Sequence, residues 1–282
     1  MQSEHLDLVC EHLKLDCKID WLAENEACDL LLDTELPAHE ISAQAIRALG
    51  SHQIDAVCTP VAGRRKKILI SDMDSTMIDQ ECIDELGEYI GVGPAIRKIT
   101  QNVINGNIGF SEALRQRIAL MKGMPENVLD TVYNERLSVK PGARQLVQTM
   151  RKSGAYCILV SGGFSFFTSR FAARIGFHDH AANHLDFEDG RLTGEVHNPI
   201  LGRTAKLDTL NRLCQERNLT PGDVLAVWDG ANDIKMISAA GLGVAFRGSA
   251  SLKNQANALV DHADLTALLY IQGYRKSEFV NS

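Results

Sequence analysis

The chain has 282 residues, which is enough for one large domain or for two smaller ones. Its formal net charge of -7 favours neither nucleic acid nor an anionic membrane surface as the main partner. No apolar run approaches the length of a membrane span, and no basic stretch followed by a long apolar run opens the chain. We therefore expect a protein without transmembrane segments or a signal peptide.

Seven cysteines are scattered through the chain, and none of them forms a CxxC pair. An odd number without paired spacing argues against a disulfide framework and against a zinc site. We expect the thiols to serve as small buried groups in a reducing cytoplasm.

The first 62 residues follow a pattern of their own. Residues 28–32 and 54–58 predict short strands, and residues 37–50 predict a helix that stops at a glycine. We interpret residues 1–62 as a small N-terminal α+β domain without a catalytic constellation. The basic run Arg64–Lys67 is predicted to be a solvated linker.

From residue 67 onward, short apolar runs alternate with helical patterns. The predicted strands are 68–70, 156–160, 224–227 and 244–246. The predicted helices are 142–151, 164–175, 204–217 and 233–240. This alternation predicts an α/β fold with a doubly wound parallel sheet.

Residues 79–137 interrupt the alternation, because their apolar residues recur only at helical spacing. We therefore predict a helical cap at 76–139, inserted into a catalytic core formed by 63–75 and 140–282.

Two carboxylates stand at the end of the first core strand, in Ile70-Ser71-Asp72-Met73-Asp74-Ser75-Thr76. Asp72 and Asp74 are two residues apart, so in extended chain they project from the same side. Two such carboxylates repel each other unless a cation is present, and Mg²⁺ prefers hard oxygen ligands. One could attack phosphorus as a nucleophile while the other transfers a proton. A DxD triplet alone also fits an acidic turn or the metal motif of a sugar-nucleotide transferase.

The next candidate segment is Ser161-Gly162-Gly163, where a predicted strand meets a predicted helix. A hydroxyl and unobstructed backbone N–H groups at a helix start suit an anion. An ordinary helix cap with turn glycines is the alternative.

Two further segments carry charge at helix starts. Lys206 offers a compact positive charge suited to a phosphoryl group, although a surface lysine is the simpler interpretation. In Trp228-Asp229-Gly230-Ala231-Asn232-Asp233, Asp229 follows a strand and could complete a Mg²⁺ shell. Asp233 could brace the lysine or metal-bound waters. The joint order and placement of the four segments favours phosphoryl-transfer chemistry over coincidence.

On these segments the chain resembles the phosphatases of the haloacid dehalogenase family, and within them those acting on phosphoserine. The similarity covers about residues 67–272. The resemblance implies that Asp72 is the nucleophile and Asp74 the general acid and base. It also implies that Mg²⁺ binds Asp72, the backbone carbonyl of Asp74, and Asp229.

The resemblance further implies a phosphate site made by Ser161, Gly162 and Lys206, with Asp233 supporting the metal and the lysine. Asn232 matches a polar group near the phosphate. Residues 1–62 are only loosely similar to the small regulatory, ACT-like domains of some relatives.

The substrate expectation rests on the same resemblance. Glu81 matches the acidic residue that binds the substrate ammonium, and Arg117 matches the arginine that holds the substrate carboxylate. Together these charges would select a zwitterionic amino acid. The expected reaction is hydrolysis of O-phospho-L-serine to L-serine and phosphate, the last step of serine biosynthesis. A first-turn helix acid and a solvated helix face are the alternatives for these two residues.

One residue departs from the family pattern, because Trp228 stands where glycine usually precedes the motif aspartate. An indole there could crowd the phosphate loop. A catalytically impaired binding or regulatory homologue therefore stays open, as does a related phosphatase for phosphothreonine or a sugar phosphate. The expected cofactor is Mg²⁺, the expected partner is the small-molecule substrate, and a homodimer is left open.

Overall fold

The structure is a computed structural model with two compact units, each described by itself. It describes residues 2–202, 204–230, 234–253 and 256–281. The first unit is Met1–Leu69, Pro141–Tyr156 and Leu213–Ser282. The second unit is Ile70–Lys140 and Cys157–Arg212.

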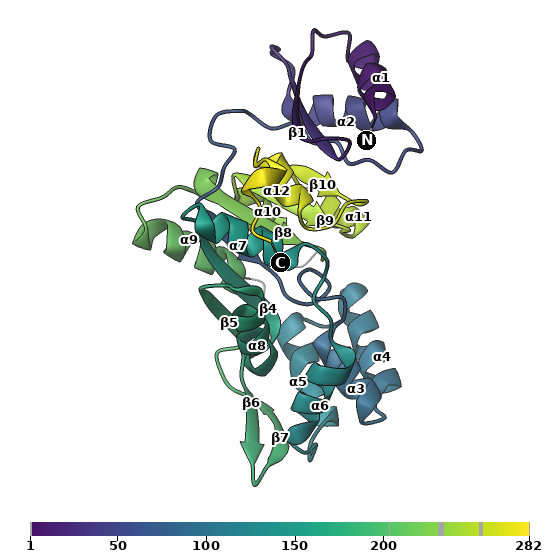
Figure 1. Ribbon diagram of the computed structural model, residues 1–282. Helices are drawn as coiled ribbons and strands as arrows, with labels where there is room; N and C mark the ends of the chain where they lie inside the picture. Colours follow the sequence, from purple (N-terminus) through teal and green to yellow (C-terminus); the bar gives the residue numbers. More distant parts are fainter. Residues whose placement is uncertain (1, 203, 231–233, 254–255, 282) are drawn as a thin grey trace. The chain divides into compact units, whose positions relative to one another are not determined.

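A six-stranded sheet follows the order β10-β9-β8-β3-β4-β5 (Figure 1). Its strands are β3 (Ile68–Ser71), β4 (Tyr156–Phe164), β5 (Asp179–Asn183), β8 (Val224–Trp228), β9 (Leu242–Phe246) and β10 (Ala258–Val260). The pairs β4–β5, β8–β9 and β9–β10 are parallel. The strand order reverses next to β3, and ligands bind at such switch points beyond the carboxyl ends of the strands. The predicted α/β class with a parallel sheet is confirmed.

The N-terminal segment of the first unit contains a two-stranded antiparallel hairpin, β1 (Lys18–Ala23) and β2 (Ala27–Leu31). Its helices are α1 (Ser3–Leu13) and α2 (Ala38–Leu49). Val9, Ile41 and further apolar residues of the two helices form a buried cluster. The sequence analysis missed α1 and β1, but β2 and α2 lie close to their predicted positions.

The predicted strand at 54–58 is wrong. Ile54, Ala56 and Cys58 instead pack their side chains against the cluster of α1 and α2. The Cys58 backbone N–H donates a hydrogen bond to Ser42 Oγ at 2.8 Å, so it joins a helix side chain and no neighbouring strand. The apolar residues of this segment pack against the core, but such residues alone do not make a strand.

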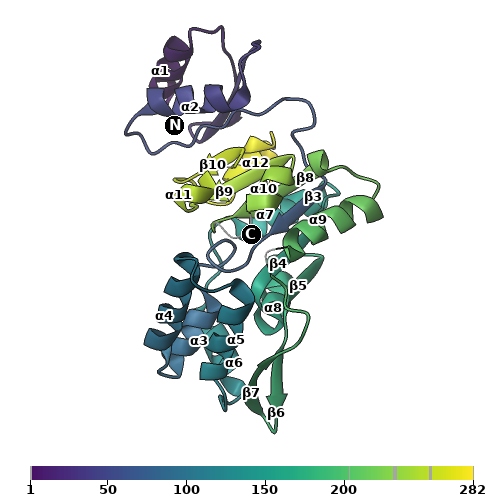
Figure 2. The ribbon, with the colours of Figure 1, turned by 180° about the vertical axis from the view of Figure 1, so that it is seen from behind.

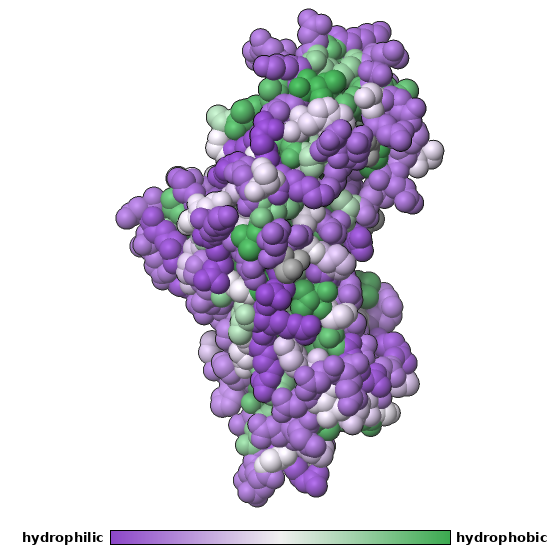
Figure 3. All heavy atoms as spheres, viewed as in Figure 1, coloured by the Kyte–Doolittle hydropathy of each residue, from purple (hydrophilic) through white to green (hydrophobic). Residues whose placement is uncertain are grey.

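The first unit also holds helices of the C-terminal half. They are α7 (Ala143–Lys152), α10 (Ile234–Ala239), α11 (Ala250–Lys253) and α12 (Ala267–Ile271), with 3₁₀ turns at Pro221–Asp223 and Lys276–Glu278. Among the large apolar side chains that stay exposed, Leu8, Ile19, Leu36, Ile46 and Val61 belong to the first 62 residues. Figure 3 shows apolar surface over this segment on an otherwise mostly hydrophilic face.

The second unit contains a helical insert between β3 and α7. Its helices are α3 (Cys82–Tyr89), α4 (Gly93–Ile104), α5 (Phe110–Leu120) and α6 (Asn127–Arg136). They cluster beside the hairpin of β6 (Leu185–Glu188) and β7 (Arg191–Val196), as Figures 1 and 2 show. The chain enters and leaves the insert side by side, because Ile78 and Val139 form an antiparallel bridge. The helical insert is confirmed, while the domain bounds 1–62, 76–139 and the remaining core stay a prediction.

Two helices complete the second unit and its border, α8 (Ser165–Ile175) and α9 (Ala205–Glu216). Strand β4 runs through Phe164, and α8 begins only at Ser165. The segment Ser161-Gly162-Gly163 belongs to the end of β4, and the helix predicted at 164–175 begins one residue later, at Ser165. The Gly163 N–H already donates to Ser161 Oγ at 2.8 Å, which keeps this segment outside the helix.

Candidate active site

The chain folds into a tight turn directly after β3, and this turn positions both predicted carboxylates. The backbone N–H groups of Met77 and Ile78 both donate to the Met73 carbonyl, at 2.8 and 3.1 Å. Ser75 takes the left-handed conformation with φ of 54°, which reverses the chain after Asp74. Met73 and Met77 are fully buried and fix the turn to the core.

Asp72 is paired with Lys206 inside this unit. The lysine Nζ lies 3.0 Å from Asp72 Oδ2, and the two side chains are only 9% and 14% exposed. The other carboxylate oxygen, Oδ1, accepts the Met73 N–H at 2.8 Å. Asp72 is therefore ion-paired with a nearly buried cation that would also face an incoming phosphate.

Asp74 is held by two hydrogen bonds from separate segments. The Cys82 backbone N–H donates to Oδ1 at 2.9 Å, and the Ser161 hydroxyl donates to Oδ2 at 3.0 Å. Burial raises the pKa of Asp74, and the negative charge of Asp72 raises it further. A carboxyl group that keeps its proton to higher pH suits a general acid.

The two glycines after Ser161 leave room for neighbouring groups. A Cβ at Gly163 would lie 2.9 Å from Asp74 Oδ2, and a Cβ at Gly162 would lie 2.8 Å from Phe110 Cζ. The backbone here therefore approaches both the carboxylate and α5 more closely than a larger residue allows.

Asn183, at the end of β5, supports the same segment. It is 2% exposed, its Nδ2 donates to the Gly162 carbonyl at 2.8 Å, and its Oδ1 accepts the Leu201 N–H at 2.7 Å. The sequence analysis missed Asn183, Phe110 and the Cys82 N–H, because none of them stands in a recognisable motif. Only the fold shows that these groups contact the Asp74 and Gly162 region.

The predicted substrate-reading residues lie in the helical insert. Glu81 precedes α3 as its N-cap residue, is exposed, and accepts a hydrogen bond from Ser75 Oγ at 2.6 Å. Arg117 lies on α5, where burial lowers its pKa and the carboxylates of Asp84, Glu81 and Asp74 act against that change. The structure thus brings Arg117 and Glu81 into the electrostatic surroundings of Asp74.

The remaining predicted site residues belong to the segment Trp228–Asp233, of which the structure describes only the beginning. Asp229 directly follows β8 in the first unit, is half-buried, and its carbonyl accepts the Ser249 N–H at 2.9 Å. Asn232 and Asp233 lie outside the described residues. Trp228 ends β8, pairs with Ala245 of β9, and is 1% exposed.

The donors of the second unit fit part of a magnesium site. The Asp72 carboxylate is a hard oxygen ligand. Among the described residues, no group donates a hydrogen bond to the Asp74 carbonyl, which leaves that oxygen available to a cation. The same described part of the chain contains no cluster of three or more His, Cys, Asp or Glu side chains suited to a metal. The fit therefore depends on a carboxylate and a backbone carbonyl, with Asp229 as the predicted third ligand.

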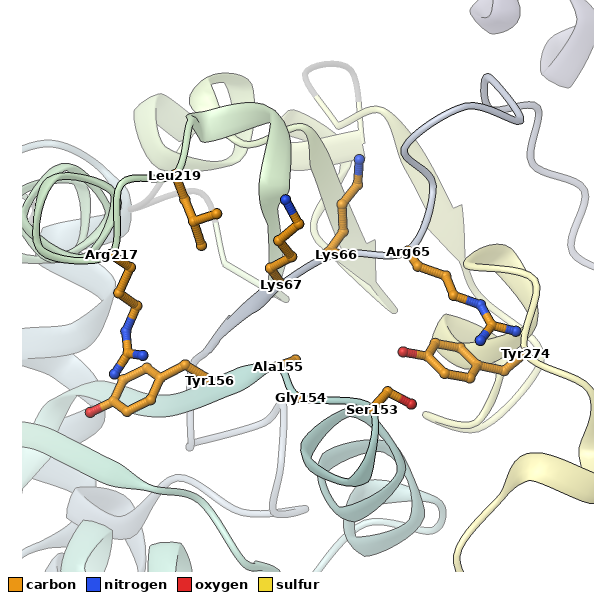
Figure 4. A pocket seen from close by; sticks show the side chains of 10 residues that line it. All are labelled: Arg65, Lys66, Lys67, Ser153, Gly154, Ala155, Tyr156, Arg217, Leu219 and Tyr274. Carbon is orange, nitrogen blue, oxygen red and sulfur yellow. The ribbon is translucent and has the colours of Figure 1, made fainter.

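A cavity of about 520 Å³ in the first unit is lined by basic and aromatic residues (Figure 4). Arg65 and Lys67 on its wall pair with Glu278 and Asp223, and Lys66 Nζ donates to two backbone carbonyls. These cations are already used within the fold, so we assign no ligand to this cavity.

Comparisons with known proteins identify the family of this chain. The family model described as haloacid dehalogenase-like hydrolase matches residues 69–238. The chain belongs to the haloacid dehalogenase-like hydrolase family. The matched segment begins within β3 and includes Asp72, Ser161, Lys206 and Asp229.

Two relatives of this chain are named phosphoserine phosphatases. A phosphoserine phosphatase of Archaeoglobus fulgidus is 38% identical over 76% of this chain, which spans 63% of that protein's length. One of Lactococcus lactis is 38% identical over 72% of this chain and 94% of that protein.

Two solved structures are similar to this chain in fold. A hydrolase of the same family from Salmonella enterica serovar Typhi matches 96% of this chain and 94% of its own, with a TM-score of 0.87 and 26% identity. A substrate-bound phosphoserine phosphatase complex matches 73% of this chain and 98% of its own, with a TM-score of 0.68 and 32% identity. Within the described residues, no helix has the length and apolar character needed to cross a bilayer.

Proposed function

We propose that the protein hydrolyses O-phospho-L-serine to L-serine and inorganic phosphate through an aspartyl phosphate on Asp72. The observation that carries this proposal is the grouping of Asp72 and Asp74, which follow β3, with Ser161 in the last part of β4 and Lys206 at the start of α9. Relatives with 38% identity that are named phosphoserine phosphatases support the substrate.

In the first step, an Asp72 carboxylate oxygen attacks phosphorus while the bond from phosphorus to the serine oxygen breaks. Asp74 gives its proton to that leaving oxygen, so serine departs as a neutral alcohol. Lys206, 3.0 Å from Asp72, offsets the repulsion between the carboxylate and the phosphate dianion. A Mg²⁺ ion, held by Asp72, the Asp74 carbonyl and Asp229, would supply further charge neutralisation.

In the second step, water attacks the aspartyl phosphate. Asp74, now ionised, takes a proton from that water, and the acyl–phosphate bond breaks to regenerate the Asp72 carboxylate. Ser161 holds Asp74 through its hydroxyl hydrogen bond and would also face the phosphate. Gly163 allows the close approach of Ser161 and Asp74 that this arrangement needs, because a Cβ there would lie 2.9 Å from Asp74 Oδ2.

Two residues of the helical insert would select the substrate. Arg117 would bind the substrate carboxylate, and Glu81 would bind the ammonium. Asn232 and Asp233 would support the phosphate and the metal, as the family pattern implies. A cytoplasmic setting fits this reaction with a small metabolite and stays a prediction.

A phosphate-release screen over small phosphate esters tests the proposal. With Mg²⁺ present, phosphoserine should be hydrolysed more efficiently than phosphothreonine, phosphoethanolamine or sugar phosphates, and chelation of Mg²⁺ by EDTA should stop the reaction. A preference for a sugar phosphate would favour a different phosphatase of the same family. No release from any ester, p-nitrophenyl phosphate included, would favour a binding or regulatory homologue.

A further inference from the structure

One carboxylate in the helical insert lacks the partner that buried carboxylates normally have. Asp84 Oδ1, in the first turn of α3, is buried and accepts no hydrogen bond among the described residues. The other described side-chain atom of this kind, Asp29 Oδ2, lies 2.7 Å from Arg64 Nη1 and is therefore ion-paired. A buried acceptor without a donor is unfavourable, and it needs a functional or structural reason.

Arg117 on α5 has hydrogen-bond donors that are not used by the described residues. Its Nε donates to the Ala113 carbonyl at 3.3 Å, but its Nη groups donate no hydrogen bond among the residues that the structure describes. Of the carboxylates acting on the half-buried Arg117, Asp84 acts most strongly, ahead of Glu81 and Asp74. The Asp84 carboxylate on α3 and the Arg117 guanidinium on α5 therefore attract each other across the insert.

A second cation, Arg97 on α4, also acts on Asp84, but less strongly than Arg117. Arg97 is engaged elsewhere, because its Nη1 forms an ion pair with Glu88. Arg117 is thus the cation whose donors are available to Asp84.

We propose that Asp84 is a positioning residue, whose negative charge attracts the Arg117 guanidinium across the helical insert and turns it toward the carboxylate of the substrate. This inference rests on the proposed function, because it requires a substrate with a carboxylate. A planar guanidinium can serve both groups at once, since its donors form a fork.

The attraction between Asp84 and Arg117 also competes with pairing of Arg117 and Glu81. After Asp84, the carboxylates that act most strongly on the Arg117 guanidinium are Glu81 and Asp74. Pairing of Arg117 with Glu81 would occupy the carboxylate that the substrate ammonium needs. By attracting Arg117, Asp84 therefore favours binding of the substrate carboxylate to Arg117 and of the substrate ammonium to Glu81.

The test is the isosteric variant Asp84→Asn, with Glu85→Gln as its control. Glu85 is the next residue of α3, and its Oε2 pairs with Arg136 Nη1 at 3.0 Å. The substrates are phosphoserine and phosphoethanolamine, which differ only in the carboxylate. We expect Asp84→Asn to raise KM for phosphoserine about tenfold, a typical coupling for contacting residues, and to leave KM for phosphoethanolamine unchanged. Glu85→Gln should change neither value.

A double-mutant cycle with Arg117→Ala separates positioning from a merely structural role. If Asp84 acts through Arg117, Asp84→Asn should have no further effect on phosphoserine KM in the Arg117→Ala background. Equal losses with both esters, or full additivity of the two changes, would overturn the inference. Retained phosphoethanolamine turnover shows that the variant is folded. Failure of the proposed function would appear differently, as wild-type protein that hydrolyses other esters but not phosphoserine, and it would overturn both.

Discussion

Lys206 Nζ lies 3.0 Å from Asp72 Oδ2, and both side chains are nearly buried. The two residues are 134 positions apart in the chain, so the pair forms only when β3 and the start of α9 come together in the second unit. In the proposed mechanism, this lysine offsets the charge of the carboxylate that attacks phosphorus. The predictions below follow from this pair and its surroundings.

Asp74→Asn separates the two proton transfers. The variant cannot protonate a serine leaving group, so we expect no burst of serine from phosphoserine. p-Nitrophenolate leaves without a proton, so a burst close to one equivalent per enzyme should survive, followed by slow turnover. Rapid-quench kinetics measure both, and equal bursts from the two esters would contradict the role of Asp74.

The raised pKa of Asp74 predicts the pH dependence of the first step. The group must be protonated to act as an acid, and its folded pKa lies above the usual value because of burial and Asp72. Serine release should therefore persist above the ordinary carboxyl range and fall as pH rises through the raised pKa. The p-nitrophenol burst should lack this decline.

The variant Phe110→Leu should rescue an alanine at one of the two glycines after Ser161 but not at the other. Gly163→Ala places a Cβ against Asp74 Oδ2 and Ser161 Oγ, so activity should fall about a hundredfold. Gly162→Ala meets only the end of the Phe110 ring, and Phe110→Leu should restore part of its lost activity. Gly109→Ala, which meets nothing within 4 Å, is the control. Rescue of Gly163→Ala by Phe110→Leu would show that the contacts are assigned wrongly.

Arg117→Ala tests recognition of the carboxylate. Loss of a charged hydrogen-bond partner should raise KM for phosphoserine at least about 30-fold, with little change for phosphoethanolamine. Arg115→Ala is the matched control, because Arg115 lies on the same helix and donates to Asn198 Oδ1 at 2.6 Å. Equal changes for both esters would mean that Arg117 does not bind the carboxylate.

The structure changes the expected effect of replacing Trp228. From the sequence, glycine at this position would be expected to keep or raise activity. The indole is 1% exposed at the end of β8, so Trp228→Gly should leave a cavity and cost about 3–5 kcal/mol of stability. Calorimetry should show a Tm lower by roughly 10 °C. An unchanged Tm would mean that the indole contributes little to packing.

Much of the core followed from the sequence, because its strands are short apolar runs with polar residues at their ends. Asp72 and Asp74 could be proposed because they follow such a run, and Lys206 because it stands near the start of a predicted helix. Asn183 and Asp84 could not, since their roles depend on contacts with the Gly162 carbonyl and with Arg117 that no local pattern encodes. The strand predicted at 54–58 failed for a related reason, as its apolar residues pack on helices.

The most direct test of the account is acid quench during turnover of phosphoserine with Mg²⁺, followed by peptide mass spectrometry. We expect a phosphoryl group on the peptide containing Asp72, and its absence from Asp72→Asn, whose turnover should fall more than about a thousandfold. A phosphoryl group on another residue, or steady turnover in Asp72→Asn, would contradict the account.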